Sequence, residues 1–141
     1  MRVLIAEDNA LERQTLQWAI QRLGHECVVA ADGVEAWQLY QAQEADVVIS
    51  DWLMPGMDGR ELCAAIRERG AATRYTYFLF LTGLADKAKV IQAMRGGADD
   101  YLVKPLNLDD LAARLLAAAR VKWLEERHKQ PHQPAGQTPR G

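Results

Sequence analysis

Cysteine and long apolar segments are scarce in this sequence of 141 residues. Its 2 cysteines, Cys27 and Cys63, lie far apart without a Cys-x-x-Cys spacing or a nearby histidine. This pattern argues against a zinc site or a disulfide framework and predicts reduced thiols in a cytoplasmic protein. No apolar run reaches the roughly 18 residues that a membrane span requires. Glu7 and Asp8 interrupt the first apolar run too early for a signal peptide, so we expect no membrane association.

An excess of positive charge is also lacking. Residues 1–119 carry 12 Lys and Arg against 17 Asp and Glu, whereas residues 120–141 carry 5 against 2. Phosphate contacts need clustered positive charge, so the acidic body argues against direct nucleic-acid binding by this domain. The basic tail is too weakly charged to indicate a binding arm. A hydrophobic content of 49% and a charged content of 26% fit one globular domain of ordinary size.

Five short apolar runs alternate with segments of helical period. The runs predict strands over residues 3–6, 27–30, 47–50, 78–81 and 101–103. Three of the intervening segments begin with a capping-box pattern, in which Asn9, Asp32 or Asp58 stands three residues before a glutamate. Strands that alternate with helices build βαβ units, and nearly continuous apolar strands are covered on both faces. The sequence therefore predicts an α/β doubly wound sandwich around a five-stranded parallel sheet.

The last helix is expected to start near Leu108 and to reach about Lys129. Its predicted core-facing stripe consists of Leu108, Leu111, Leu115 and Ala118. Past Arg120 we expect it to project beyond the body. Prolines and glycines then end regular structure, so residues 123–141 are predicted to form a C-terminal helix extension followed by a flexible tail or a truncated linker.

Polar side chains follow four of the predicted strands, where the carboxyl ends of parallel strands share one edge. They are Glu7, Asp8, Asp51, Thr82 and Lys104. Three neighbouring carboxylates raise one another's pKa unless a cation lies between them, and oxygen ligands suit Mg²⁺ or Mn²⁺. A metal facing an aspartate, with a lysine ready to pair with added negative charge, predicts phosphorylation of Asp51.

The same residues lie in motifs that resemble the receiver domain of two-component response regulators. Across about residues 1–122, the chain matches that family in order and spacing at Glu7-Asp8, Asp51-Trp52-Leu53-Met54-Pro55-Gly56-Met57-Asp58-Gly59, Thr82-Gly83 and Tyr101-Leu102-Val103-Lys104-Pro105. The loop after Asp51 is the most specific of them. The resemblance implies a flavodoxin-like fold with sheet order 2-1-3-4-5 and five helices, the order that describes a chemotaxis member of this family.

The resemblance also implies roles for the residues at this edge. Asp51 accepts a phosphoryl group from a phosphohistidine of a sensor histidine kinase or histidine phosphotransfer protein. Mg²⁺ is held by Asp8, Asp51 and the backbone carbonyl of Leu53, and by Glu7 through water. Lys104, followed by Pro105, pairs with the phosphoryl oxygens. Thr82 and Tyr101 rearrange and change the surface of the fourth helix, fifth strand and fifth helix.

Four small or apolar residues flank the expected phosphoryl position. Gly83 leaves an opening for the donor imidazole, and Trp52 covers the sheet edge beside the acceptor. Leu53 and Leu84 are apolar where many relatives have polar side chains, which predicts that they exclude the hydrolytic water and lengthen the phosphorylated lifetime. Incidental packing in the loop is the alternative explanation for both leucines.

Other functions remain open at this point. The chain is expected to be a phosphoacceptor switch rather than an enzyme, acting alone on a partner, as a phosphorylation-dependent homodimer, or on an output domain such as a diguanylate cyclase. A metal-dependent phosphohydrolase of the haloacid-dehalogenase type would need a second aspartate where Leu53 stands. A receiver-like module that is never phosphorylated would usually lack the acceptor, the acidic pair or the lysine, and this chain has all of them.

Overall fold

The computed structural model describes residues 1–70, 74–83 and 87–129, and five strands alternate with five helices in this part of the chain. In order they are β1 (Arg2–Ala6), α1 (Ala10–Arg22), β2 (Glu26–Ala30), α2 (Gly33–Ala42), β3 (Val47–Asp51), α3 (Gly59–Arg69), β4 (Tyr77–Thr82), α4 (Lys87–Arg95), β5 (Asp100–Val103) and α5 (Leu108–Lys129). All strand pairs are parallel, in the order β2-β1-β3-β4-β5. The predicted fold class is confirmed, and every strand begins and ends within one residue of its prediction.

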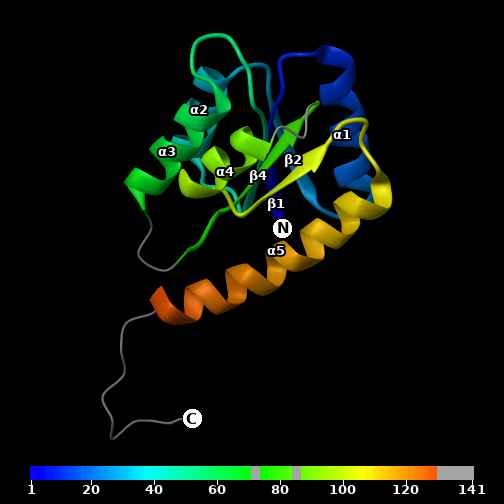
Figure 1. Cartoon of the computed structure of the whole chain (residues 1–141). Coiled ribbons are helices and arrows are strands. Elements are labelled where there is room, and N and C mark those ends of the chain that lie inside the picture. Colours follow the sequence, from blue (N-terminus) through cyan, green and yellow to red (C-terminus); the bar gives the residue numbers. More distant parts are fainter. Residues whose placement is uncertain (71–73, 84–86, 130–141) are drawn as a thin grey trace, which may run out of the picture.

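Helices cover both faces of the sheet, with α2, α3 and α4 on one face and α1 and α5 on the other (Figure 1). Successive strand residues point to opposite faces. Leu4 and Phe78 therefore join the core beneath α2, α3 and α4, while Ile5 and Leu79 join the core beneath α1 and α5. Two buried faces explain why the strands are apolar at nearly every position.

Of the predicted capping boxes, the one at α3 is complete and the one at α1 is not. At α3 the box is complete: Asp58 accepts from the N–H of Glu61 at 2.9 Å, and Glu61 accepts from the N–H of Asp58 at 3.0 Å. At α1, Asn9 accepts from the N–H of Glu12 at 3.0 Å, but its own N–H donates to Glu7 at 3.1 Å. The carboxylate of Glu12 is therefore not used in the cap and takes a different partner.

Helix α5 stays attached to the body beyond Arg120, so the predicted projection at that point is wrong. The Lys122 ammonium is buried, donates to the backbone oxygen of Tyr75 at 2.7 Å and lies 3.2 Å from Asp46. Glu126 accepts from the N–H of Tyr75 at 2.9 Å and from Lys122 at 2.5 Å. We refer to Asp46, Tyr75, Lys122 and Glu126 as the α5 clamp. The helix was expected to project, whereas its charges pair with residues on the amino-terminal side of β3 and β4.

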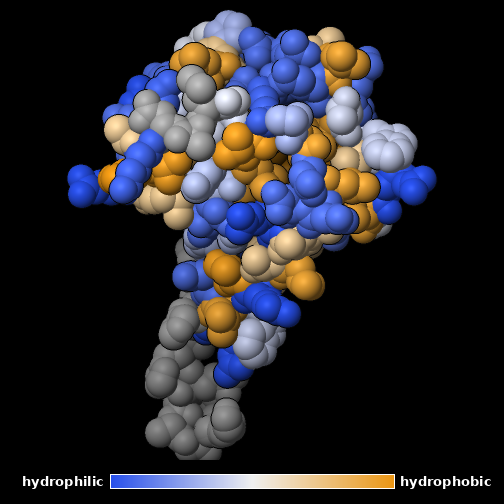
Figure 2. Space-filling model, turned by 45° about the vertical axis from the view of Figure 1, so that its right-hand side comes forward, coloured by the Kyte–Doolittle hydropathy of each residue, from blue (hydrophilic) through white to orange (hydrophobic). Residues whose placement is uncertain are grey.

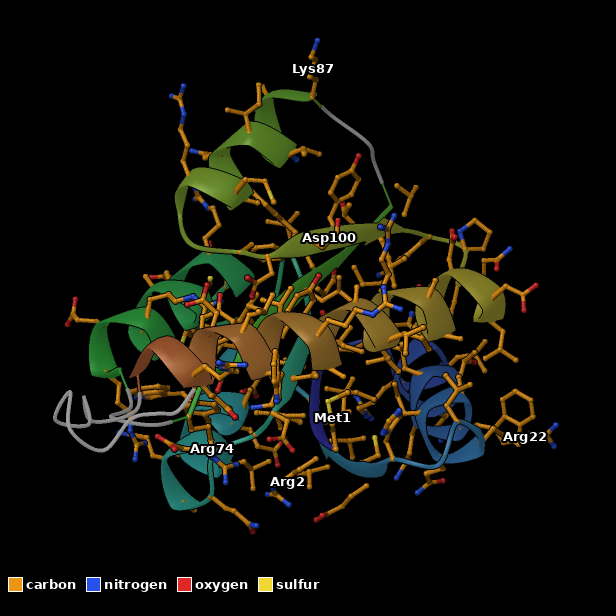
Figure 3. All side chains as sticks on the ribbon, turned by 90° about the horizontal axis from the view of Figure 1, so that it is seen from below. Met1, Arg2, Arg22, Arg74, Lys87 and Asp100 are labelled. Atoms are coloured by element: carbon orange, nitrogen blue, oxygen red, sulfur yellow. The ribbon has the colours of Figure 1, made fainter. Side chains whose placement is uncertain are left out.

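The opposite face of α5 is exposed and partly apolar. Leu116, Trp123 and Leu124 are all more than half exposed, and Figure 2 shows hydrophobic and polar residues side by side on the part of the molecule below the body. Leu108 is 39% exposed, so the predicted core stripe begins at Leu111 instead. In the view from below, α5 crosses the molecule from the side of α1 to the side of α3 (Figure 3). Within the described residues, no helix has the length and apolar character needed to cross a membrane.

Candidate functional site

The carboxyl ends of β1, β3, β4 and β5 bring the predicted polar residues to one edge of the sheet. Glu7 follows β1, Asp51 ends β3, Thr82 ends β4 and Lys104 follows β5. The register aligns Asp51 with Leu81 and Thr82 with Val103, so these strand ends are neighbours. The expected convergence is present in the structure.

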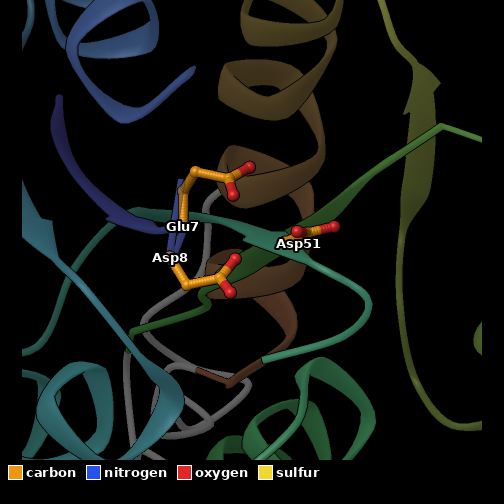
Figure 4. A group of neighbouring side chains, drawn as sticks. All are labelled: Glu7, Asp8 and Asp51. Carbon is orange, nitrogen blue, oxygen red and sulfur yellow. The ribbon is translucent and has the colours of Figure 1, made fainter. Parts of the chain in front are cut away.

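Three carboxylates meet at this edge. Oxygen atoms of Glu7, Asp8 and Asp51 lie within 4.8 Å of one another, and Figure 4 shows the three side chains grouped together. Glu7 is 1% exposed, whereas Asp8 is open to solvent. Burial is the largest cause that raises the pKa of Glu7, and the negative charge of Asp51 adds to it. The Asn9 N–H and Lys104 oppose this rise, and the pKa reaches about 7.

Lys104 connects the carboxylates to the end of β5. Its ammonium lies 3.1 Å from Glu7 Oε1 and 3.5 Å from Asp51 Oδ2, and it also pairs with Glu12. Burial alone would lower the pKa of Lys104, but hydrogen bonds to Glu12 and Glu7 and the charge of Asp51 outweigh it and raise this pKa. The backbone N–H of Lys104 donates to the backbone carbonyl oxygen of Thr82 at 2.7 Å, which fixes this residue beside β4, and the peptide bond to Pro105 is cis.

The loop after Asp51 folds back tightly against its own strand. The N–H of Trp52 donates to Asp51 Oδ1 at 2.8 Å, and the N–H of Gly59 donates to the Trp52 carbonyl at 3.0 Å. A Cβ added at Gly59 would lie 2.3 Å from the Asp51 carbonyl oxygen and 2.7 Å from the ring of Phe80. Gly59 is therefore needed because α3 begins in contact with the Asp51 backbone. Gly56, with φ of +77°, supplies the turn in the same loop.

A cavity of ≈ 210 Å³ opens above Asp51. We call it the Asp51 hollow, and its lining residues are Asp51, Trp52, Leu53, Thr82, Gly83 and Lys89. Leu53 is 67% exposed, and a Cβ added at Gly83 would meet nothing within 4 Å. Trp52, expected to cover the sheet edge, is buried and belongs to the core beneath α2, α3 and α4, with its ring centroid 4.9 Å from that of Phe80. Tyr101 is partly buried against the core beneath α4. Leu84 lies outside the described residues.

Two charged residues at this site were missed by the sequence interpretation. Glu12 was assigned to a helix cap, and its contact with Lys104 joins residues far apart in the chain. Lys89 lies on α4 and lines the Asp51 hollow, but nothing in the period of that short helix distinguishes it. Only the fold places these two side chains beside the predicted ones.

Comparisons with known proteins agree with this geometry. A family model described as response regulator receiver domain matches residues 3–116. The transcriptional regulatory protein TcrA of Mycobacterium tuberculosis is 38% identical over 85% of this chain and 46% of its own length. AfsQ1 of Streptomyces coelicolor, also named a transcriptional regulatory protein, is 35% identical over 84% of this chain and 51% of its own length. The chain thus spans about half the length of these curated relatives.

Solved structures show the same fold. The chemotaxis protein CheY4 of Vibrio cholerae is 35% identical, with a TM-score of 0.77 over 83% of this chain and 97% of that chain. A response regulator receiver domain protein from Clostridium thermocellum is 27% identical, with a TM-score of 0.79 over 87% of this chain and 97% of that chain. Fold, motif order and family match agree, and the chain belongs to the receiver domain family of two-component response regulators.

Proposed function

We propose that this chain is a phosphorylation-dependent switch in which Asp51 accepts a phosphoryl group with the help of a divalent metal. The observation that carries the proposal is the meeting of three carboxylates and Lys104 at one end of the sheet. Asp51 lines the Asp51 hollow, through which a donor can approach it. Membership of the receiver family supports a phosphohistidine donor, carried by a sensor histidine kinase or a histidine phosphotransfer protein.

The chemistry of the donor set fits Mg²⁺, with Mn²⁺ as a substitute. Carboxylate oxygens are the ligands that these ions prefer, and the open position of Asp8 leaves room for the waters that Mg²⁺ retains. In this proposal Asp8, Asp51 and the Leu53 carbonyl hold the ion, and Glu7 acts through water. When bound, the ion supplies positive charge that stabilises the oxygens of the transferring group.

In this proposal, residues of the protein bind and transfer the phosphoryl group. A carboxylate oxygen of Asp51 forms a bond to phosphorus as the phosphorus–nitrogen bond of the donor breaks. The imidazole leaves with the electron pair of that bond and takes its proton from water. Lys104 balances negative charge on the phosphoryl oxygens, and Thr82, on the wall of the hollow, donates a hydrogen bond to them. Gly83 leaves the donor side of the hollow open.

The switch acts through the surface formed by α4, β5 and α5. Phosphorylation adds about −1.5 to −2 charges and three strong acceptors, so it favours the loop arrangement that supplies donors. Movement of Thr82 makes room for Tyr101 to turn inward from β5. The changed surface then controls a partner, a second copy of the chain or a linked output domain. The curated relatives are transcriptional regulators about twice as long, which makes gene regulation the output that we propose for the whole protein.

Intact-mass measurement after incubation with acetyl phosphate and Mg²⁺ tests the proposal. We expect one phosphoryl adduct on the parent protein and none on Asp51→Asn. Asp58→Asn is the matched control, because Asp58 is a carboxylate of the same loop that caps α3. It should still accept the phosphoryl group. An adduct that persists in Asp51→Asn, or a parent protein that never forms one, contradicts the proposed acceptor.

A further inference from the structure

Glu12 is a fourth carboxylate at the site, and neither the motifs nor the proposed reaction uses it. We infer that Glu12 is a positioning residue: its carboxylate holds the Lys104 ammonium back from Asp51 until a phosphoryl group displaces it. This inference rests on the proposed function, because it describes how Lys104 is held before the phosphoryl group arrives. Glu12 would thus compete with the phosphoryl group for Lys104 and lower the affinity of the site for that group.

The contacts of Lys104 support this competition. Of the three carboxylates around its ammonium, Glu12 is nearer than Glu7 at 3.1 Å and Asp51 at 3.5 Å. Of its three carboxylate partners, the ammonium is therefore nearest to the one on α1 and farthest from the acceptor. A phosphoryl group on Asp51 carries more negative charge than the single charge of Glu12. It would therefore attract the Lys104 ammonium away from Glu12 and toward Asp51.

The local structure of α1 explains why Glu12 is available. In a complete capping box the glutamate binds the backbone N–H of the cap residue, as Glu61 does at α3. In α1 the equivalent N–H, from Asn9, already donates to Glu7. Glu12 keeps its backbone hydrogen bond to Asn9, but its carboxylate is directed to Lys104 instead. The buried Glu7 thus indirectly places Glu12 in the site.

The surroundings of Glu12 include solvent and a cavity that its side chain could enter once it is displaced from Lys104. Its side chain is 42% exposed, although the Oε1 atom that meets Lys104 is buried, so the displaced carboxylate would have to turn toward solvent to avoid a buried unpaired charge. The pair borders a cavity of ≈ 540 Å³ between α1 and the loop after β5, whose walls include Leu11, Leu16 and Leu106. In this proposal Glu12 turns toward solvent when a phosphoryl group takes its place at Lys104.

Removing the Glu12 charge should strengthen binding of a phosphoryl mimic. A partly exposed ion pair is a modest competitor, so Glu12→Gln is expected to lower the apparent Kd for beryllofluoride about two- to fivefold at saturating Mg²⁺. Because the cap at α1 uses the backbone N–H of Glu12, thermal stability should hardly change. Tryptophan emission, with Trp52 beside Asp51, reports the binding.

Two further variants separate the contact from its alternatives. Glu35→Gln removes a carboxylate three residues after the cap of α2, where it binds the N–H of Ala31, and should leave the Kd unchanged. Glu12→Gln combined with Gln14→Glu restores the net charge of α1 at an exposed position and should keep the tighter binding.

The outcomes are distinct. A parent protein that binds no beryllofluoride contradicts the proposed function, and this inference with it. If the parent binds and Glu12→Gln binds no more tightly, Glu12 does not compete for Lys104. A return to the parent Kd when Gln14→Glu is added assigns the effect to general repulsion, and an equal gain in Glu35→Gln does the same. Either result overturns the positioning role.

Discussion

Replacing Gly59 by alanine should damage both stability and the site, because the added methyl group meets the backbone that carries Asp51. The new Cβ would stand 2.3 Å from the Asp51 carbonyl oxygen and 2.7 Å from the Phe80 ring. Overpacking of this kind costs about 1–3 kcal/mol, and a backbone atom cannot rotate away as a side chain does. Alanine gains about 1 kcal/mol over glycine in a helix interior, but Gly59 is the first residue of α3, so this gain offsets little of the cost.

We therefore expect Gly59→Ala to lower the free energy of unfolding by about 1–3 kcal/mol and the Tm by about 3–9 °C. Displacing the Asp51 backbone should also weaken Mg²⁺ binding about tenfold, the lower end of the range for changes that reposition a metal ligand. Urea denaturation and Mg²⁺ titration by calorimetry measure the two effects on the same samples.

Gly96→Ala is the matched control. A Cβ there would lie 3.4 Å from the Gln92 carbonyl oxygen and 3.5 Å from that of Ala93, which amounts to close but tolerable contact. This variant should lose little stability and bind Mg²⁺ as the parent does. If Gly59→Ala unfolds at the parent's urea concentration and binds Mg²⁺ equally well, the close approach of α3 to Asp51 does not constrain the site, and the reasoning is refuted.

Five other changes have expected results. Asp8→Ala should weaken Mg²⁺ binding at least tenfold by calorimetry, whereas Trp52→Phe should abolish the emission change and leave binding intact; equal affinity in Asp8→Ala would argue against the metal site. Lys122→Met should cost about 1–3 kcal/mol in urea denaturation, because its backbone and carboxylate acceptors lose their donor; an unchanged midpoint would refute this. Burial raises the pKa of Asp46, but a backbone N–H and the Lys122 ammonium outweigh it and leave this pKa below its ordinary value. The stability difference between the parent and Asp46→Asn should therefore be full above about pH 4 and shrink as the pH falls further, and a constant difference would contradict the pairing. Leu53→Asn should shorten the phosphorylated half-life, by up to about 10²-fold if it orients the hydrolytic water, and an unchanged decay would show that Leu53 does not exclude that water.

The strands and the shared edge of the sheet were predictable because they follow from local runs and general rules of topology. The apolar run before Asp51 identifies a buried strand, and parallel strands necessarily end at one edge. Contacts between distant charged residues were not predictable in the same way. Glu12 matched a local capping pattern. Its partner in the structure, Lys104, follows the last strand, β5, and is therefore remote from Glu12 in the chain. The contacts of Lys122, and with them the attachment of α5 past Arg120, were missed because Asp46 and Tyr75 are remote in the chain.

The α5 clamp ties the last helix to the same strands that carry the site, but at their opposite ends. Asp46 directly precedes β3, which ends in Asp51, and Tyr75 lies shortly before β4, which ends in Thr82. A strand of five residues spans only about 17 Å and hardly changes length. A small tilt of β3 or β4 at the phosphorylation end would therefore also move Asp46 and Tyr75, the residues to which α5 is attached. Anything joined to that helix would then be reoriented through the strands, in addition to the change in the surface of α4, β5 and α5.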